Sequence, residues 1–396
     1  MKDFSFNEQN VKSQHGVGVL RAVSDFYSLF RGSMIEWIAS VYDKSSGGFY
    51  FSHSARDTEG YYPDIESTGQ ALGVLQDLGL TPDPVTFPEP FRTKVVEFLR
   101  NLQDPDGFFY HPQWGKDINT SRRGRDLASA SLFIEMFGST LKYPSALTKM
   151  QKAKDSGEES SIPEHLRSKE AFVNYLDSLK VNELSYSAGQ AIAMQSPQIK
   201  AVGLDSVCID YLNERQYENG IWEKELNYSS ANGMLKICHA YNALGYDLPR
   251  LPLVAEATVA TALSPVKPAA ITDVFNPMMS IHYLKNIVKN TGSSERLAEL
   301  NSVLSTSTVK VFDTTADKLS IFLQSDGSFS YYPVGYSYGE YQWSQCVKVA
   351  PGVDEGNMNA TQLARATQIL ITEALSVDTG LPYTVRDGEE FFALLD

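Results

Sequence analysis

One sequence pattern recurs four times along this 396-residue chain and constrains its fold more than any other feature. In each copy, a glycine turn and an aromatic extended segment precede a stretch that opens with polar or hydroxyl residues and continues with small and apolar ones. The copies lead from residues 45–54 into 64–79, from 104–115 into 125–138, from 217–225 into 229–245, and from 324–335 into 355–370. Such self-similarity indicates a fold built from repeated supersecondary units.

Two further stretches, at 182–195 and 272–288, resemble the helix starts of these copies but lack the glycine turn. After their opening turns, the helices of this first set carry few Lys or Glu residues, as expected for helices that are enclosed on all sides. We expect these inner helices to start near residues 64, 123, 182, 229, 273 and 355.

A second set of candidate helices has apolar residues three and four positions apart, with charged residues between them, which is typical of a helix with one solvated face. These stretches lie at 89–103, 166–180, 199–216 and 294–324. Alternation of the two sets predicts an all-α fold, a closed α/α toroid of about six inner and six outer helices. We expect one domain over residues 1–396, with a solvated loop insertion near 150–165.

The repeated units also carry a resemblance. The stretches "FLRNLQDPDGFFY" at 98–110 and "YLNERQYENGIW" at 211–222 are similar to the Gln, Asp/Asn-Gly, aromatic repeats of terpenoid cyclases and protein prenyltransferase β-subunits. The resemblance covers most of the chain and implies the α/α toroid. That fold also occurs in polysaccharide lyases and in proteins without catalysis, so it does not by itself define a function.

Charge and composition exclude several classes of partner. The formal net charge of −14 disfavours binding to nucleic acid and to anionic lipid. No apolar run approaches the roughly 18 residues of a membrane span, and the N-terminal residues do not resemble a signal peptide, so we expect a cytoplasmic protein. Cys208, Cys238 and Cys346 show no CxxC spacing, which predicts free thiols.

Two carboxylates, Asp64 and Glu66, stand where the first inner helix is expected to begin. One interpretation is structural, since an Asp before the first turn caps the helix and both acids favour the positive end of its dipole. The other is catalytic. "PDIESTGQAL" is similar to the DxDD-T stretch of class II terpene cyclases, with Asp64 in the first acidic place, Glu66 in the middle place of the proton donor, and Thr68 as the trailing Thr. The final Asp is replaced by Ser67.

Candidate binding residues come from the same end of the repeats. Arg122, Arg123 and Arg125 open the next inner helix and suit a phosphate or carboxylate, or else form a solvated loop that pairs with surface acids. Cys238-His239 resembles zinc ligands of prenyltransferase β-subunits. Adjacent helical residues point about 100° apart, however, so we expect no metal or other cofactor, with Cys238 in the core and His239 lining a cavity.

Aromatic residues concentrate in the loops, and Tyr dominates with 21 copies. We expect these loops to gather at one mouth of the toroid, where Tyr and Trp can stabilise a cation or stack on sugars. The candidate substrate-binding aromatics are Tyr61, Tyr62, His111, Trp114, Tyr338 and Trp343. The expected partner is a small molecule, either an isoprenoid or a saccharide; whether a partner subunit is needed stays open.

Three functions remain possible. A terpenoid-cyclase-like enzyme ranks first, because the acidic stretch matches in helix position as well as in sequence. A carbohydrate-active hydrolase or lyase is favoured by the polar inner helices; there, His53 or His239 with a Tyr would be acid and base, and the arginines would hold a uronate. A non-catalytic binding module is third.

Overall fold

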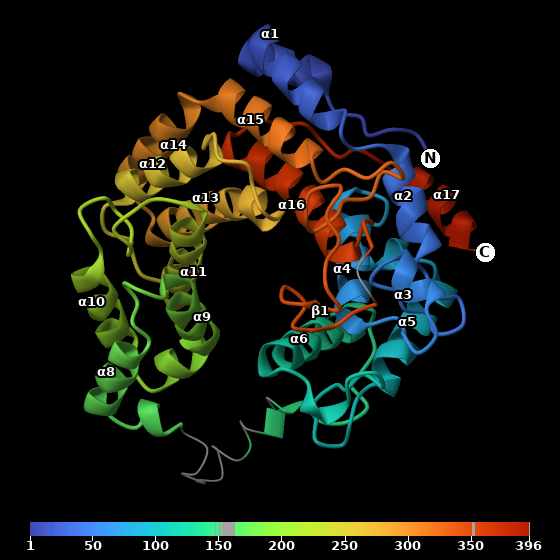
Figure 1. The fold of residues 1–396 in the computed structure, drawn as a ribbon, viewed down its shortest axis with the longest axis horizontal. Helices are drawn as coiled ribbons and strands as arrows, with labels where there is room; N and C mark the ends of the chain where they lie inside the picture. The colour runs from blue at the N-terminus through green and yellow to red at the C-terminus, as the bar shows by residue number, and fades with distance from the viewer. Residues whose placement is uncertain (147, 150–151, 153–162, 351–352, 396) are drawn as a thin grey trace.

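The computed structural model describes residues 1–146, 148–149, 152, 163–350 and 353–395, and it is mostly helical. Figure 1 shows one group of helices around the middle of the molecule and a second group outside it. The inner helices are α4 (Ile65–Asp77), α6 (Thr120–Met136), α9 (Ser185–Ala201), α11 (Tyr228–Leu244), α13 (Thr272–Thr291) and α16 (Met358–Ala374). They begin within three residues of the predicted positions, so the assignment of the inner set is confirmed.

The outer helices alternate with the inner ones along the chain. They are α5 (Glu89–Asn101), α8 (Lys169–Ser178), α10 (Asp205–Arg215), α12 (Leu251–Ala262), α14 (Ser294–Ser305) and α15 (Thr308–Ser320). Two predicted boundaries were wrong. The stretch 294–324 forms two helices, and residues 199–201 belong to α9, which continues past Pro197 until Gly203 turns the chain with a φ of 74°.

The N-terminal and C-terminal helices lie on the outside of the ring, and Figure 1 marks the two ends of the chain near one another there. The sequence patterns did not reveal the helices there, which are α1 (Glu8–Tyr27), α2 (Gly32–Ser40), the short α3 (His53–Asp57) and α17 (Val385–Leu395). The remaining elements are 3-10 turns at Pro84–Thr86, Gly115–Asp117 and Glu164–Leu166, and the antiparallel strands β1 (Tyr341–Gln342) and β2 (Val347–Lys348). No other paired strands occur in the described part of the chain.

The glycine turns repeat in structure as well as in sequence. In the fourth turn, the Gly327 N–H donates to Gln324 O at 3.0 Å and the Gln324 N–H donates to Ser328 O at 2.8 Å. A Cβ on Gly327 would lie 2.7 Å from the backbone nitrogen of Met34, so this turn packs directly against α2. The four turn glycines, Gly47, Gly107, Gly220 and Gly327, all have positive φ, between 85° and 96°, which only glycine adopts without strain.

The inner helices pack in the order α9, α11, α13, α16, α4 and α6. The closest pair is α9 and α11, because Gly189 and Gly233 face the partner helix, where a Cβ would lie under 3 Å from Ile237 N and Ser185 Oγ. In the described residues, α6 and α9 share no comparable packing, so a closed toroid is not established by these contacts. The predicted loop insertion near 150–165 lies mostly outside the described residues.

Candidate functional site

The start of α4 holds both predicted carboxylates. Asp64 is the N-cap: its Oδ1 accepts from the Ser67 backbone N–H at 3.0 Å, and its Oδ2 accepts from the Ser67 hydroxyl at 2.6 Å. The capping interpretation is therefore right for Asp64. Asp64 is also buried, with 3% of its surface exposed, and its Oδ1 lies 2.6 Å from Nη2 of Arg122. A surface cap does not have such a partner.

Arg122, on the first turn of α6, is the centre of a buried ionic cluster. Its side chain is 1% exposed, and three carboxylates surround the guanidinium. Asp64 lies on one side, Asp126 Oδ1 is 2.8 Å from Nε, and Glu66 Oε2 is 3.2 Å from the same Nε. Because these carboxylates favour the charged guanidinium, the pKa of Arg122 is raised above its usual value despite burial. Arg122 is thus held by acids of its own chain.

Glu66 is the member of the cluster with the most perturbed carboxyl group. Burial raises the pKa of Glu66 to about 7; the nearby charges of Arg122 and Arg125 oppose this rise, and those of Asp126 and Asp64 add to it. Its side chain is 11% exposed, and its Oε1 lies 3.1 Å from Arg125 Nη1. A carboxyl group with this pKa is protonated in a substantial fraction of molecules at neutral pH, which suits a general acid.

Asp126 was missed in the sequence. It lies one turn after Arg122 on α6, pairs with it, and burial raises the pKa of Asp126 to about 6. The signal that could have revealed it is the spacing of four residues, which brings Arg122 and Asp126 together on one helix face. Asp126 adds a third carboxylate to the cluster, and it comes from the neighbouring helix.

Arg125 lies at the edge of the cluster, with unused hydrogen-bonding capacity. Its Nη1 donates to Ser344 O at 2.8 Å, whereas Nε and Nη2 are buried without a hydrogen-bond partner among the described residues. Across the middle of the molecule, the positive charge of Arg125 acts with burial to lower the pKa of Lys236 on α11. The Lys236 ammonium lies 5.2 Å from the ring centre of Tyr186 on α9. Arg125 is thus the member of the cluster whose charge reaches an inner helix beyond α4 and α6.

The strands β1 and β2 form a hairpin that covers the cluster. Arg122 Nη1 donates to Gln345 O at 3.2 Å, and Trp114 Nε1 donates to Lys348 O at 2.9 Å. The Trp114 ring also stacks on the guanidinium of Arg122, 4.7 Å away. Figure 1 shows the hairpin inside the ring of helices, over the beginnings of α4 and α6. The hairpin therefore shields the ionic cluster from water.

The predicted aromatic loops converge, but they mostly fill space. Tyr61, Trp114 and Tyr338 belong to one small apolar cluster, and His111 stacks on Trp114 with ring centres 4.3 Å apart. His111 Nε2 is 2.8 Å from Pro63 O, and burial lowers the pKa of His111. Instead of lining an open mouth, these rings pack against one another around the start of α4.

The remaining candidates take no part in the ionic contacts of the cluster. Trp343 and Tyr62 are exposed, and Arg123 stacks on Phe108 at 4.8 Å, away from the other two arginines. His239 stacks on Tyr283 with ring centres 4.8 Å apart, and burial lowers its pKa. His53 Nε2 lies 2.7 Å from Ser40 Oγ. Cys238 is a buried free thiol, and burial raises its pKa to about 12.

The described residues contain no group of three His, Cys, Asp or Glu side chains placed to hold a metal ion. None of their helices combines the length and the apolar character that crossing a membrane requires. Comparisons with models of protein families, with curated proteins and with solved structures find no match to this chain.

Proposed function

We propose that this protein is a terpenoid-cyclase-like enzyme in which Glu66 protonates an isoprenoid substrate. The observation that carries the proposal is the buried carboxyl group of Glu66 in the first turn of α4, where burial raises its pKa to about 7. Protonation of an alkene needs an acid that is neutral near physiological pH and protected from water. Burial beside Asp64 and Asp126 and the covering hairpin both support this role.

The reaction would use the cluster as follows. The Glu66 O–H gives its proton to one alkene carbon, and the other carbon becomes a cation. Arg122 and Arg125 stabilise the carboxylate that remains, because both guanidinium groups lie within 3.2 Å of its oxygens. Asp64 holds Arg122 in place and caps α4, so it acts as a positioning residue. The proposal includes closure of the inner helices into a toroid whose middle admits the substrate.

The test is incubation of the full chain with geranyl, farnesyl and geranylgeranyl diphosphate, followed by mass spectrometry of the extracted products. Wild type should form a cyclised product, and Glu66→Gln should abolish it, since Gln keeps the shape but cannot donate an acidic proton. Glu170→Gln is the matched control, because Glu170 occupies the same position, two residues after the N-cap Ser168, on the outer helix α8 and is exposed. Equal activity of Glu66→Gln and wild type would refute the proposal.

A second candidate is supported by Arg125. Its two buried N–H groups without partners suit the carboxylate of a uronate, so the same cluster would serve a polysaccharide hydrolase or lyase. Incubation with oligogalacturonate and oligoglucuronate, read out by chromatography of the products, tests this candidate. Cleavage that is lost in Arg125→Met would replace the terpenoid proposal. If neither substrate class is converted but one binds, the protein is a binding module.

A further inference from the structure

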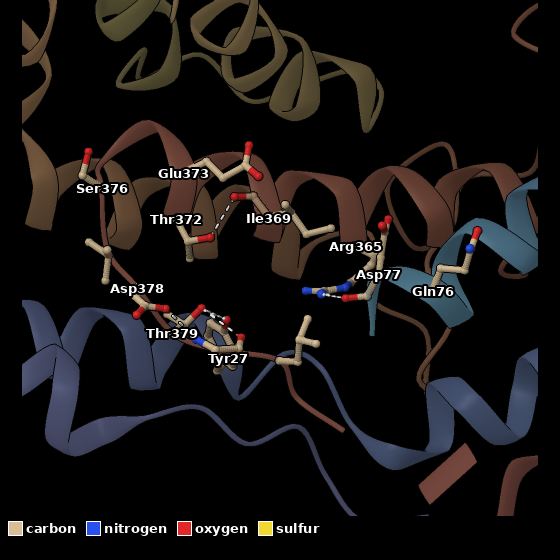
Figure 2. Close-up of a pocket in the computed structure, with 13 residues that line it drawn as sticks. Tyr27, Gln76, Asp77, Arg365, Ile369, Thr372, Glu373, Ser376, Asp378 and Thr379 are labelled. Atoms are coloured by element: carbon tan, nitrogen blue, oxygen red, sulfur yellow. Dashed lines mark hydrogen bonds between the residues drawn. The ribbon is translucent and has the colours of Figure 1, made fainter. Parts of the chain in front are cut away.

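A second site lies at the opposite end of α4, about 20 Å from the ionic cluster at 1.5 Å per helical residue. It is a cavity of about 620 Å³ between the C-terminal ends of α4 and α16, the helix α1 and residues 376–381. Its volume lies within the range of about 300–1,000 Å³ that is typical of small-molecule sites. Figure 2 shows the Arg365 side chain pointing into it from α16.

Arg365 differs from Arg122 in its charged partners. Both guanidinium groups are buried, but Arg365 forms no salt bridge with any described residue. It donates to the Gln368 side chain and to the carbonyl of Asp77, whereas its Nε–H has no partner. Burial lowers the pKa of Arg365 to about 10, and the charge of Asp77, which forms no salt bridge with it, only partly opposes this. An unneutralised buried cation is costly, so an anion in the cavity would stabilise it.

The other charges around the cavity restrict that anion. Asp77, Glu373 and Asp378 also line it, so the cavity is lined by three acidic residues and a single arginine. Each has some compensation from protein groups. Asp77 feels the charge of Arg365, Glu373 lies 3.6 Å from His282, and Asp378 accepts from Asn10 at 3.1 Å. A ligand with several negative charges would be repelled, whereas one carboxylate together with an ammonium group matches the arrangement.

The walls supply the rest of the specificity. Ile369, Val377 and Leu381 contribute apolar surface, and Thr379 accepts a hydrogen bond from the Tyr27 hydroxyl at 2.8 Å. We propose that this cavity binds a free α-amino acid with a large apolar side chain. The ligand carboxylate pairs with Arg365, its ammonium group faces the surrounding acids, and its side chain lies against the apolar wall. This inference does not depend on the function proposed for Glu66.

Calorimetric titration of the full chain tests the site with L-leucine, L-isoleucine, L-methionine, L-phenylalanine, L-tyrosine and L-tryptophan. We expect at least one to bind, and Arg365→Met to weaken binding by about tenfold or more. Arg386→Met is the matched control, because it removes the same charge from an exposed position on α17. If Arg365→Met does not fold, Ile369→Trp, which fills the cavity from its wall, should block binding with Arg365 intact.

The acids are tested with a matched set of probes. 3-Phenylpropanoate lacks the amine of L-phenylalanine, and 2-phenylethylamine lacks its carboxylate; both should bind more weakly than L-phenylalanine. Asp378 is exposed, and Asp378→Asn should reduce the ratio by which L-phenylalanine binds more tightly than 3-phenylpropanoate. Three results would overturn the proposal: no binding of any of the six amino acids, unchanged binding in both Arg365→Met and Ile369→Trp, or tighter binding of inorganic phosphate than of the amino acids.

Discussion

The beginnings of α4 and α16 occupy equivalent places in two repeats but carry different chemistry. The N-cap is Asp64 in α4 and Asn357 in α16, and each accepts from the backbone N–H three residues later, at 3.0 Å and 2.9 Å. Two residues after the cap stand Glu66 and Asn359. The same backbone is therefore capped by an amide in one repeat and by an acid in the other, so capping does not explain why α4 has carboxylates.

The surroundings of the two caps are otherwise alike. The residue that follows the glycine turn donates its backbone N–H to a threonine on the helix: Phe49 to Thr68 at 2.9 Å, and Phe329 to Thr361 at 3.1 Å. What distinguishes α4 is Arg122, which reaches it from α6. The two helices share a common frame, which consists of the N-cap and the threonine contact. The acids of α4 belong in addition to an ionic cluster with Arg122.

The largest expected effect comes from removing the centre of that cluster. Arg122→Met leaves three buried carboxylates without their main partner and should lower the free energy of unfolding by about 3–5 kcal/mol. Urea denaturation followed by circular dichroism measures it. Arg123→Met, which removes an arginine that stacks on Phe108 outside the cluster, should cost less than about 1 kcal/mol. Equal losses in the two variants would mean that the cluster contributes little.

The pH dependence of stability should also separate α4 from α16. The pKa of Glu66 rises from 4.5 in the unfolded chain to about 7 in the folded protein, so folding favours the protonated form. Its stabilising contribution is complete below pH 4.5 and is lost as the pH rises through 7. The loss is roughly 3 kcal/mol. Asp126 acts in the same direction.

Urea denaturation of wild type and Glu66→Gln between pH 4.5 and pH 8 isolates this contribution. The stability of the variant relative to wild type should rise with pH, because Gln does not ionise. A difference that stays constant over this range would contradict a raised pKa for Glu66.

A smaller effect is expected when the cap of α4 is made like that of α16. Asp64→Asn keeps the acceptor for the Ser67 N–H, but it removes the charge that faces Arg122 and the oxygen that accepts from the Ser67 hydroxyl, which should cost about 2 kcal/mol. Asn357→Ala removes a cap without an ionic partner and should cost about 1 kcal/mol. Thermal unfolding of both variants checks the order. The cluster interpretation fails if Asp64→Asn is as stable as wild type.

The smallest difference between α4 and α16 is expected at the threonine that accepts a backbone N–H in each repeat. Thr68→Val and Thr361→Val each leave one buried backbone N–H without its acceptor, which alone should cost about 1 kcal/mol or slightly more. Thr68→Val also removes the hydrogen bond that Thr68 Oγ1 donates to Asp64 O at 2.7 Å, so its loss should exceed that of Thr361→Val by about 1 kcal/mol. A much larger excess for Thr68→Val would show that the frame at α4 is itself coupled to the ionic cluster.

The repeated frame was predictable because it depends on local chemistry. Glycines at positive φ, Asp or Asn caps, and helices poor in Lys and Glu are all visible in the sequence, and they located the starts of the inner helices. The outer helix at α5 was predicted almost to the residue. α1, α2 and α17 were missed because they stand outside the repeats, where no recurring pattern supports a weak periodicity.

The candidate site was only half predictable. Asp64 and Glu66 could be found because they stand two positions apart at a helix start. The partners that decide their chemistry come from elsewhere: Arg122 and Asp126 from α6, and the covering hairpin from residues 341–348. Likewise, sequence alone does not reveal that Arg365 is buried without an acid, because this depends on which side chains the fold leaves out of reach.

The packing of the Gly327 turn on α2 has a consequence for synthesis of the chain. Residues 33–34 contact residue 327, and the Asn7 N–H donates to Thr379 O at 2.9 Å, so α1 and α2 complete these contacts only with segments that are synthesised much later. During translation, their apolar faces must wait until those segments have left the ribosome. Contacts of such long range are slow to form, so α1 and α2 are exposed to chaperones and to aggregation for a long part of synthesis.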